Sequence, residues 1–365
     1  MRTPRRGALL VSVLALLAAF ASPATAGTVV PPGFQPASTS WTGPDTGYVL
    51  GYRPCAKSWC PALLGTTDAG RHWRRLGAPP VPLPDNHNHV AVRAFGDRVA
   101  YVSDGVHVRT TRDGGETWQP VTLAGAREPY YLSKIAETGG RVFAVLTTYG
   151  EGQGSTRLYS AAAGSPVLAP VPGFAVTGGL TYGDLAVGGG LQVALGANYG
   201  TEQYWISRDG VRFTPAEPPC PDGEVASLAG VRERQVVALC SSSPGSPQPG
   251  STERQLRHAP QLGVGFSGDD AAPFAGINQG FAAASPASAT VAAVGGGVGF
   301  LHNTADGGRT WSTTELPDRG FALTDLDFPG RGTGVVVDGQ PDASGGSAVY
   351  RTTDGGKTWG EVHFG

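Results

Sequence analysis

The sequence predicts an all-β fold built from one short unit that recurs along the chain. A turn motif of the form Ser/Thr-x-Asp-x-Gly-x-x-Trp occurs four times, and a shortened copy that ends in Phe213 makes a fifth. Asp68 and Asp113 lie 45 residues apart, and Asp306 and Asp354 lie 48 apart. Between the motifs, short runs of alternating apolar and polar residues are separated by Gly and Asp, the pattern of β-strands joined by turns.

Each residue of the motif has a structural task. The Asp carboxylate accepts hydrogen bonds from amides of its own turn, and the Gly adopts a positive φ. The aromatic ring begins the next strand and covers the hairpin, so we expect the tryptophan rings to be buried. A turn repeated along the whole chain supports the fold rather than a reaction. The residues that we assign to this structural role are Asp68, Gly70, Trp73, Asp113, Gly115, Trp118, Asp209, Phe213, Asp306, Gly308, Trp311, Asp354, Gly356 and Trp359.

Two gaps in the series have twice the usual length. Asp113 and Asp209 are 96 residues apart, and Asp209 and Asp306 are 97 apart. A decayed copy at 160–167 keeps Ser160 and Gly164 but has Ala162 in place of Asp, and spacing alone places another at 258–266. The last unit contains four predicted strands, at 321–328, 333–338, 347–354 and 358–364. The sequence therefore predicts a single β-propeller of seven four-stranded antiparallel blades over residues 34–365, with six blades as the alternative.

The motif resembles the Asp box, or bacterial neuraminidase repeat (BNR), of β-propellers. Over nearly the whole mature chain, the sequence is similar to exported bacterial propellers of the photosystem II assembly-factor and sialidase-like superfamily. This resemblance implies a non-catalytic platform that binds a protein or a glycan. The motif is specific for the fold and not for the task.

The sialidase branch of the same superfamily implies an alternative, an exo-sialidase-like glycoside hydrolase acting at the central channel. Such enzymes clamp the substrate carboxylate with three arginines and use a Tyr–Glu nucleophile pair. The matching residues would be Arg53, in the segment 52–54, and Tyr131 beside Glu128. No other arginine falls at a blade entry in the third, fourth or sixth unit, so we favour the non-catalytic function.

The N-terminal residues predict export. Arg2, Arg5 and Arg6 precede an apolar run, and the small residues around Ala26 form a cleavage site, so residues 1–26 are expected to be a signal peptide and 27–33 a tether. Without that segment, 24 basic residues face 29 acidic ones. A mildly acidic chain argues against nucleic acid and anionic membranes as partners. We expect a secreted monomer that does not insert into a membrane after cleavage.

Four cysteines in an exported chain predict two disulfides. Cys55 and Cys60 share one loop, while Cys220 precedes the first strand of the fifth unit and Cys240 ends its second strand. In a four-stranded blade these last two positions lie at the same face. We therefore predict the pairs 55–60 and 220–240.

The expected contact surface is the face opposite the acidic turns, where loops join the blades and connect second to third strands. Aromatic and polar side chains there suit a glycan or a polypeptide. The pair His87 and His89 could place two imidazoles on one side of a strand, but no third ligand is evident, so we expect no metal and no cofactor. The candidate ligand-binding residues are Tyr52, Arg53, Trp59, Asn88, His89, Tyr130, Tyr131 and Tyr199.

Overall fold

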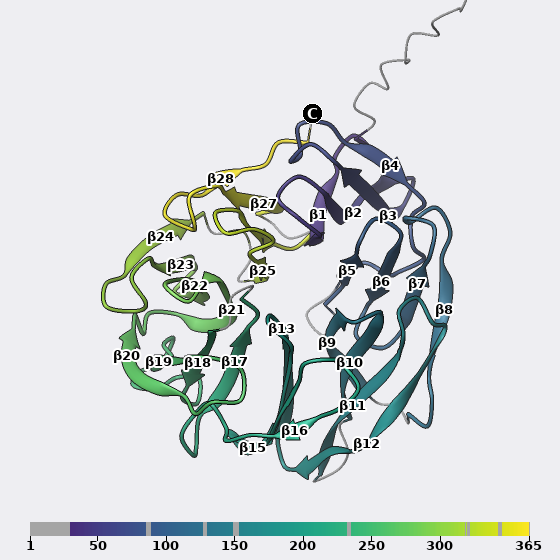
Figure 1. Ribbon diagram of the computed structural model, residues 1–365. Coiled ribbons are helices and arrows are strands. Elements are labelled where there is room, and N and C mark those ends of the chain that lie inside the picture. The colour runs from purple at the N-terminus through teal and green to yellow at the C-terminus, as the bar shows by residue number, and fades with distance from the viewer. Residues whose placement is uncertain are drawn as a thin grey trace, which may run out of the picture.

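The computed structural model shows a ring of β-sheets around a central axis (Figure 1). It describes residues 30–84, 89–126, 130–148, 153–231, 235–317, 319, 322–341 and 345–364. Within these ranges there is no helix, and therefore none long and apolar enough to span a membrane. The expected signal segment 1–26 lies outside the described residues.

Five of the six sheets contain four consecutive antiparallel strands each. The first sheet has β1 (Gln35–Trp41), β2 (Gly47–Cys55), β3 (Ser58–Thr66) and β4 (Arg74–Leu76). Another has β13 (Thr181–Val187), β14 (Leu191–Ala197), β15 (Gly200–Ser207) and β16 (Thr214–Pro215), and the next has β17 (Val225–Ala229), β18 (Val236–Ser241), β19 (Arg254–Ala259) and β20 (Ser267–Ala272). The last two have β21 (Ile277–Ser285), β22 (Ser288–Gly295), β23 (Val298–Thr304) and β24 (Ser312–Leu316), then β25 (Leu323–Asp327), β26 (Gly334–Gly339), β27 (Ser347–Thr352) and β28 (Gly360–Glu361).

The remaining sheet has eight strands, made from two antiparallel runs of four. One run has β5 (Ala91–Phe95), β6 (Val99–Ser103), β7 (Val108–Thr111) and β8 (Gln119–Leu123), and the other has β9 (Tyr130–Thr138), β10 (Arg141–Thr148), β11 (Gly154–Ala162) and β12 (Val167–Gly178). The runs join at the rim, where Val167 and Leu168 pair in parallel with Thr122 and Leu123. This junction directly follows the decayed turn.

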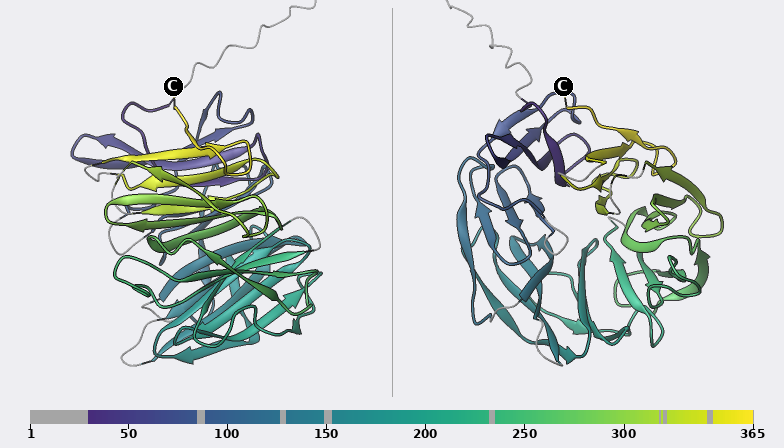
Figure 2. Two further views of the ribbon diagram at one scale, coloured as in Figure 1. Left: turned by 90° about the vertical axis from the view of Figure 1, so that its left-hand side faces the viewer. Right: turned by 180° about the vertical axis from the view of Figure 1, so that it is seen from behind.

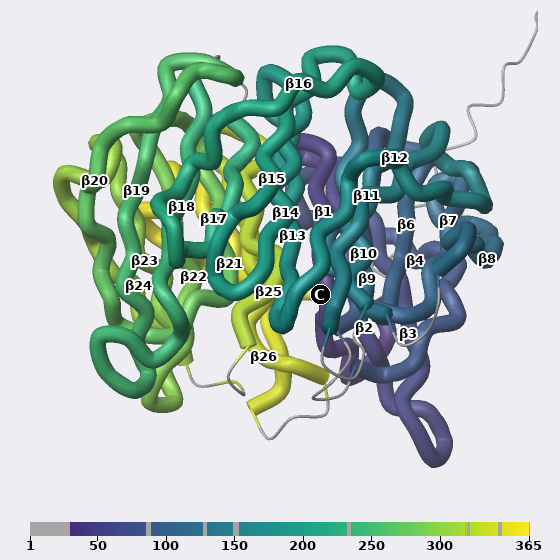
Figure 3. Tube along the Cα trace, turned by 90° about the horizontal axis from the view of Figure 1, so that it is seen from below, coloured from purple at the N-terminus to yellow at the C-terminus, as the bar shows by residue number. Residues whose placement is uncertain are grey.

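The core lies between neighbouring sheets. The left view of Figure 2 and Figure 3 show the ring of sheets edge-on. The second strand of each run is the most enclosed: every residue of β14, β18 and β26 is buried. Between the first two runs, Leu50 and Leu63 share one cluster with Val92 and Val102. Both faces of such a strand are buried because its sheet packs between the two adjacent sheets of the ring, and this accounts for its continuous apolar sequence.

The first and last sheets meet by side-chain packing, without exchange of a strand. Trp41 and Trp73 share a cluster with Val335 and Val349, with Phe364 packed against it. The ring centroids of Phe364 and Trp73 are 5.1 Å apart. No strand is exchanged between these two sheets, because each already holds four consecutive strands.

Turns occur where the motif spacing placed them, including both places where the motif has decayed. Residues 163–166 join β11 to β12, and residues 260–266 join β19 to β20. In the third run Ala163 N–H donates to Gly140 O, as Gly114 N–H donates to Arg98 O in the second. The decayed turn therefore keeps the backbone contact with the neighbouring hairpin that an intact copy makes.

Candidate functional site

The two ends of the ring differ in structure. We call the end that carries the turns between third and fourth strands the lower end; the acidic turns at Asp68, Asp113, Asp209, Asp306 and Asp354 lie there. The upper end carries the connections from one run of four strands to the next and the loops between second and third strands. Figure 3 shows β13, β14 and β15 running side by side between these two ends.

The acidic turns are closed by their own carboxylates. In the second run, Asp113 accepts from the N–H of Thr117 at 2.9 Å and from its hydroxyl at 2.6 Å. The Thr111 hydroxyl donates to Asp113 and accepts from Gly115 N–H at 3.0 Å. Hydrogen bonds of this kind stabilise the ionised carboxylate. In the equivalent turn at Asp306, the hydroxyl and the amide of Thr310 lower the pKa of the Asp306 carboxyl to about 2. These carboxylates are already occupied and serve the turn.

The tryptophan rings of the acidic turns are less buried than the sequence predicted. Trp73 is buried, but Trp118, Trp311 and Trp359 are half-buried. Trp73 differs from them because Trp41 and Phe364 pack against its ring where the first and last sheets meet. The indole N–H of Trp118 donates to Gly77 O at 2.8 Å, which anchors the ring to the preceding run of strands.

Tyr52 does not form part of an exposed surface. Its side chain is fully buried, and its hydroxyl donates to Pro82 O. Desolvation raises the pKa of the phenol, with a smaller contribution from Asp104. Tyr52 is therefore a core residue beneath the β4–β5 connection. From the sequence alone, this buried position could not be distinguished from a position in a surface loop.

The other candidate residues that the structure describes in the first three runs lie at the upper end. Arg53 and Trp59 flank the Cys55–Cys60 disulfide in the β2–β3 hairpin, and both are half-buried. His89 is exposed just before β5. Asn88 and Glu128 lie outside the described residues.

Tyr131 and Tyr199 mark two further parts of the upper end. Tyr130 and Tyr131 begin β9, and Tyr131 is close enough to Arg93 to help raise the pKa of that guanidinium. Tyr199 occupies the turn between β14 and β15 with φ of 63°, next to Asn198 at 51°. Two consecutive positive φ values are typical of a type I′ hairpin turn. The candidate tyrosines are thus spread along the upper end and are not gathered in one pocket.

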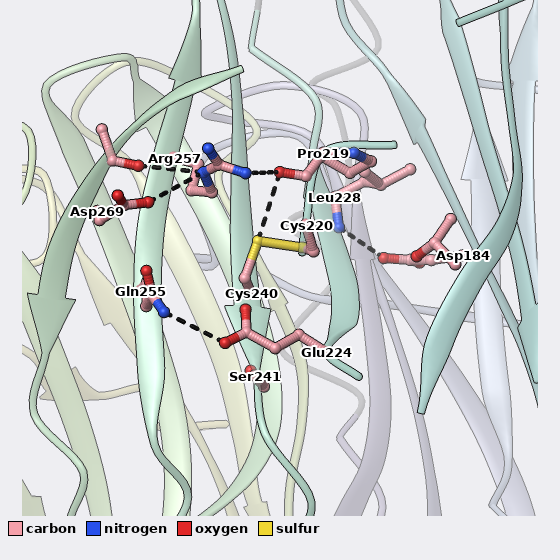
Figure 4. Close-up of a disulfide and its surroundings, with 12 residues drawn as sticks. Asp184, Pro219, Cys220, Glu224, Leu228, Cys240, Ser241, Gln255, Arg257 and Asp269 are labelled. Carbon is pink, nitrogen blue, oxygen red and sulfur yellow. Dashed lines mark hydrogen bonds and ion pairs between the residues drawn. A yellow bond between two sulfur atoms is a disulfide. The ribbon is translucent and has the colours of Figure 1, made fainter. Parts of the chain in front are cut away.

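Both predicted disulfides are present, and both brace upper-end segments. Cys220, in the connection between β16 and β17, is bonded to Cys240 on β18 (Figure 4). The same connection is held by Arg257, whose guanidinium donates to Pro219 O at 2.9 Å. The Cys220–Cys240 disulfide and Arg257 therefore both hold the β16–β17 connection in place.

A second upper-end connection, 273–276, is held by a buried arginine. Arg254 is 1% exposed and donates to the carbonyls of Pro273, Ala275 and Gly276. Desolvation lowers its pKa to about 10. Within this connection Phe274 has half of its surface exposed. Sequence reasoning missed these residues because Arg254 matches no motif and its partners are backbone atoms.

His302 supports the same connection from β23. Its Nε2 lies 3.0 Å from Ala275 O and its Nδ1 lies 2.8 Å from the Thr313 hydroxyl. Because a carbonyl only accepts, Nε2 carries the proton and Nδ1 accepts from Thr313. Desolvation lowers the pKa of His302 to about 4, so the ring is neutral at physiological pH.

The axis of the ring contains a cavity of about 290 Å³. It is lined by the first strand of each run of four: β1, β5, β9, β13, β17, β21 and β25. The wall from β13, β17 and β21 is apolar, with Leu185, Leu228 and Phe281 among its residues. All charged lining residues lie on β5, β9 and β25: Arg93, Lys134, Glu137, Asp325 and Asp327.

Two ion pairs cross between strands of this channel. Arg93 Nη2 lies 2.6 Å from Asp325 Oδ1, and Lys134 Nζ lies 3.2 Å from Asp184 Oδ1. Desolvation lowers the pKa of Arg93, but Asp325 outweighs it and the net direction is upward. Asp325 has φ of 55° at a bulge of β25, a conformation that non-glycine residues rarely adopt.

The bulge allows Asp325 to bridge both ends of the chain. Its carboxylate accepts from the Ser38 hydroxyl and from Thr39 N–H at 2.9 Å, both on β1. The same carboxylate binds Arg93 on β5. Asp325 therefore closes the ring on the channel side, opposite the aromatic packing around Trp73.

Comparison with known proteins identifies the fold. No family model and no curated protein matches the chain. A puromycin-hydrolyzing peptidase of Mycobacterium tuberculosis aligns with a TM-score of 0.57 and 15% identity, over 94% of this chain and 55% of that one. A PL25 ulvan lyase aligns with a TM-score of 0.54 and 10% identity, over 91% and 93%. Prolyl oligopeptidase B from Galerina marginata aligns with a TM-score of 0.53 and 9% identity, over 87% and 49%.

This chain is a β-propeller. At these identities the likeness extends to the fold alone, and the chain spans about half the length of the two peptidases. The four-stranded antiparallel sheets agree with it.

Proposed function

We propose that this protein is a secreted, non-catalytic binding propeller of seven blades that contacts a protein or glycan ligand with its upper end. The observation that carries the proposal is the bracing of upper-end segments. Two disulfides and the buried pair Arg254 and His302 hold three separate segments there. Loops fixed before binding lose less conformational entropy when a ligand arrives.

The count of seven treats the eight-stranded sheet as two blades joined at the rim. The parallel link between β8 and β12 involves two residues of each strand, whereas β10 and β11 pair over eight positions. The acidic turns act in this account as Asp boxes that rigidify the lower end. Two disulfides are compatible with an oxidising, extracellular location, which is the environment that the N-terminal sequence predicts.

A sialidase-like activity receives no support from the channel. Of the residues described as lining it, Arg93 is the one arginine, and Asp325 already neutralises it. Arg53, the proposed first arginine of a clamp, lies in the β2–β3 hairpin at the upper end instead. A three-arginine clamp requires side chains that converge on one carboxylate.

A fluorogenic sialoside assay tests the enzymatic alternative, with Arg53→Ala as control. We expect no turnover; turnover that disappears in the variant would refute the non-catalytic function. For the binding function, the mature protein is immobilised and exposed to culture medium and to a glycan array. Trp59→Ala and Phe274→Ala should reduce the signal, because both rings lie at the upper end.

The matched control is Trp311→Ala, which removes a half-buried ring from the lower end. If that variant reduced binding as strongly as Trp59→Ala, the contact surface would not be the upper end. Because the mature chain is only mildly acidic, binding should change little between low and physiological salt. A steep dependence on salt would contradict a mainly uncharged contact.

A further inference from the structure

The central channel has two chemically different walls. Phe281, Leu228 and Leu185 belong to its apolar side, on β21, β17 and β13. The charged side is formed by β25, β5 and β9. A cavity that combines an apolar wall with a few converging polar groups has the composition of a small-molecule site.

The charges of the channel do not cancel. Two cations, Arg93 and Lys134, face four carboxylates: Glu137, Asp325 and Asp327 in the lining, and Asp184 behind Lys134. The two ion pairs neutralise Asp325 and Asp184. Two carboxylates therefore remain in excess, and the net charge is −2 when all four are ionised.

The excess carboxylates differ in position. Glu137 accepts from Gly140 N–H at 2.7 Å in the β9–β10 hairpin, so it belongs to the lower mouth of the channel. Asp327 accepts from Phe328 N–H at 2.8 Å and is exposed to the channel. Among the residues that the structure describes, no ion pair involves Asp327.

The surrounding protein makes Asp327 an unfavourable place for an unbalanced charge. Desolvation raises the pKa of its carboxyl, and the Asp325 charge adds to this effect, although Phe328 N–H and the charges of Arg93 and Lys134 act in the opposite direction. A bound cation would supply the missing opposite charge, because charges attract more strongly beside the channel wall, where protein replaces part of the surrounding water, than in bulk water.

We propose that the central channel binds an organic ammonium group, with Asp327 as its counter-ion and the β13–β17–β21 wall in contact with the apolar part of the same molecule. The apolar wall distinguishes this ligand from a metal ion or a small inorganic cation, since those would gain nothing from Phe281 and Leu228. Consistent with this, the described residues contain no group of three His, Cys, Asp or Glu side chains arranged to hold a metal. The ammonium could belong to a free amine or to a lysine side chain of a polypeptide.

Three probes with one apolar body and different head groups test the proposal: 4-phenylbutylamine, 4-phenylbutan-1-ol and 4-phenylbutyrate. We expect calorimetry at pH 7 to show that the amine binds at least about 10-fold more tightly than the alcohol, because one partly desolvated ion pair is worth about 1.4 kcal/mol or more. The carboxylate should not bind detectably. Tighter binding of the carboxylate than of the amine would overturn the proposal, as would equal binding of amine and alcohol.

Asp327→Asn should remove the preference for the amine over the alcohol while leaving the apolar contact in place. The matched control is Asp97→Asn, which removes an exposed carboxylate from the β5–β6 turn at the lower end. Unchanged amine affinity in Asp327→Asn, with a melting temperature close to that of the wild type, would refute the role of Asp327.

The capped peptide acetyl-Ala-Lys-Ala-amide distinguishes the two sources of ammonium. Binding of the peptide that is lost in Asp327→Asn would assign the site to a polypeptide lysine, whereas binding of 4-phenylbutylamine alone would assign it to free amines. Absence of binding by both would refute the site. The proposal does not depend on the upper-end function, because Trp59→Ala should leave amine binding unchanged and Asp327→Asn should leave upper-end binding unchanged.

Discussion

The neutral state of His302 makes the stability of this propeller depend on pH between about 4 and 6.5. The ring is buried, its Nε2 donates to Ala275 O, and its Nδ1 accepts from Thr313. Protonation would abolish the acceptor at Nδ1 and place a second cation near Arg254, which already lowers the pKa of His302. The folded protein therefore resists protonation at this residue.

The sign of the effect follows from the two pKa values. In the unfolded chain the imidazole has its ordinary pKa of 6.5, and in the folded protein the pKa is about 4. Between these values the unfolded state binds more protons, so stability falls as the pH is lowered. With these two values, the loss between pH 7.5 and pH 5 is about 2 kcal/mol, and it approaches about 3 kcal/mol at lower pH.

Thermal unfolding of the wild type and of His302→Gln measures this contribution. The amide of Gln can donate to Ala275 O but does not titrate, so the variant should lose less stability on acidification. A difference of about 2 kcal/mol corresponds to a melting temperature about 3 °C lower in a domain of this size. We expect the wild type to lose that much more than the variant between pH 7.5 and pH 5.

The exposed residue His363 provides the control. His363→Gln should leave the dependence of the melting temperature on pH unchanged. The reasoning would be refuted if wild type and His302→Gln lost the same number of degrees. The acidic turns do not affect the comparison, because their carboxylates lose their stabilising effect only as the pH falls from the ordinary pKa of 3.8 toward the folded value of about 2, which is below the range measured.

Three further predictions concern stability. Trp73→Ala should cost about 3–5 kcal/mol in chemical denaturation, and Trp118→Ala clearly less, because Trp73 is buried and Trp118 half-buried; equal costs would contradict this difference in burial. Asp113→Ala should lower the melting temperature without affecting ligand binding, since every hydrogen bond described for its carboxylate lies within its turn. Lost binding at an unchanged melting temperature would show a functional role. The double variant Cys220→Ser, Cys240→Ser should lose about 3 kcal/mol of unfolding free energy, which is more than removal of the Cys55–Cys60 disulfide should cost, because that disulfide closes a shorter loop. Free thiols in a non-reduced digest of the wild type would refute both pairings.

The repeated turns and the strand pattern could be predicted because both depend on residues close together in the sequence. Asp113 bonds to Thr111, Glu116 and Thr117, all within four positions. Hydrogen bonds of that range are encoded in a short motif, so the motif spacing located even the degenerate turns. The disulfides followed from the same order of strands, which placed Cys220 and Cys240 at one end of a sheet.

The tertiary structure alone decided which side chains face the ligand-accessible surface and which meet in the channel. Tyr52 was expected at the surface and is buried, because the β4–β5 connection covers it and the carbonyl of Pro82 accepts a hydrogen bond from its hydroxyl. The ion pair of Arg93 with Asp325 joins residues 232 positions apart. Neither contact produces a repeating pattern in the sequence from which it could be predicted.

Ring closure explains this division between sequence and structure. Each first strand presents its side chains to an axis that exists only when all the sheets are assembled, so Asp327, Lys134 and Phe281 become neighbours of one cavity through the curvature of the whole ring. Local sequence determined the repeated unit, because hydrogen bonds within a turn and the alternation of a strand are short-range. Closure determined the channel, because its walls come from every part of the chain at once.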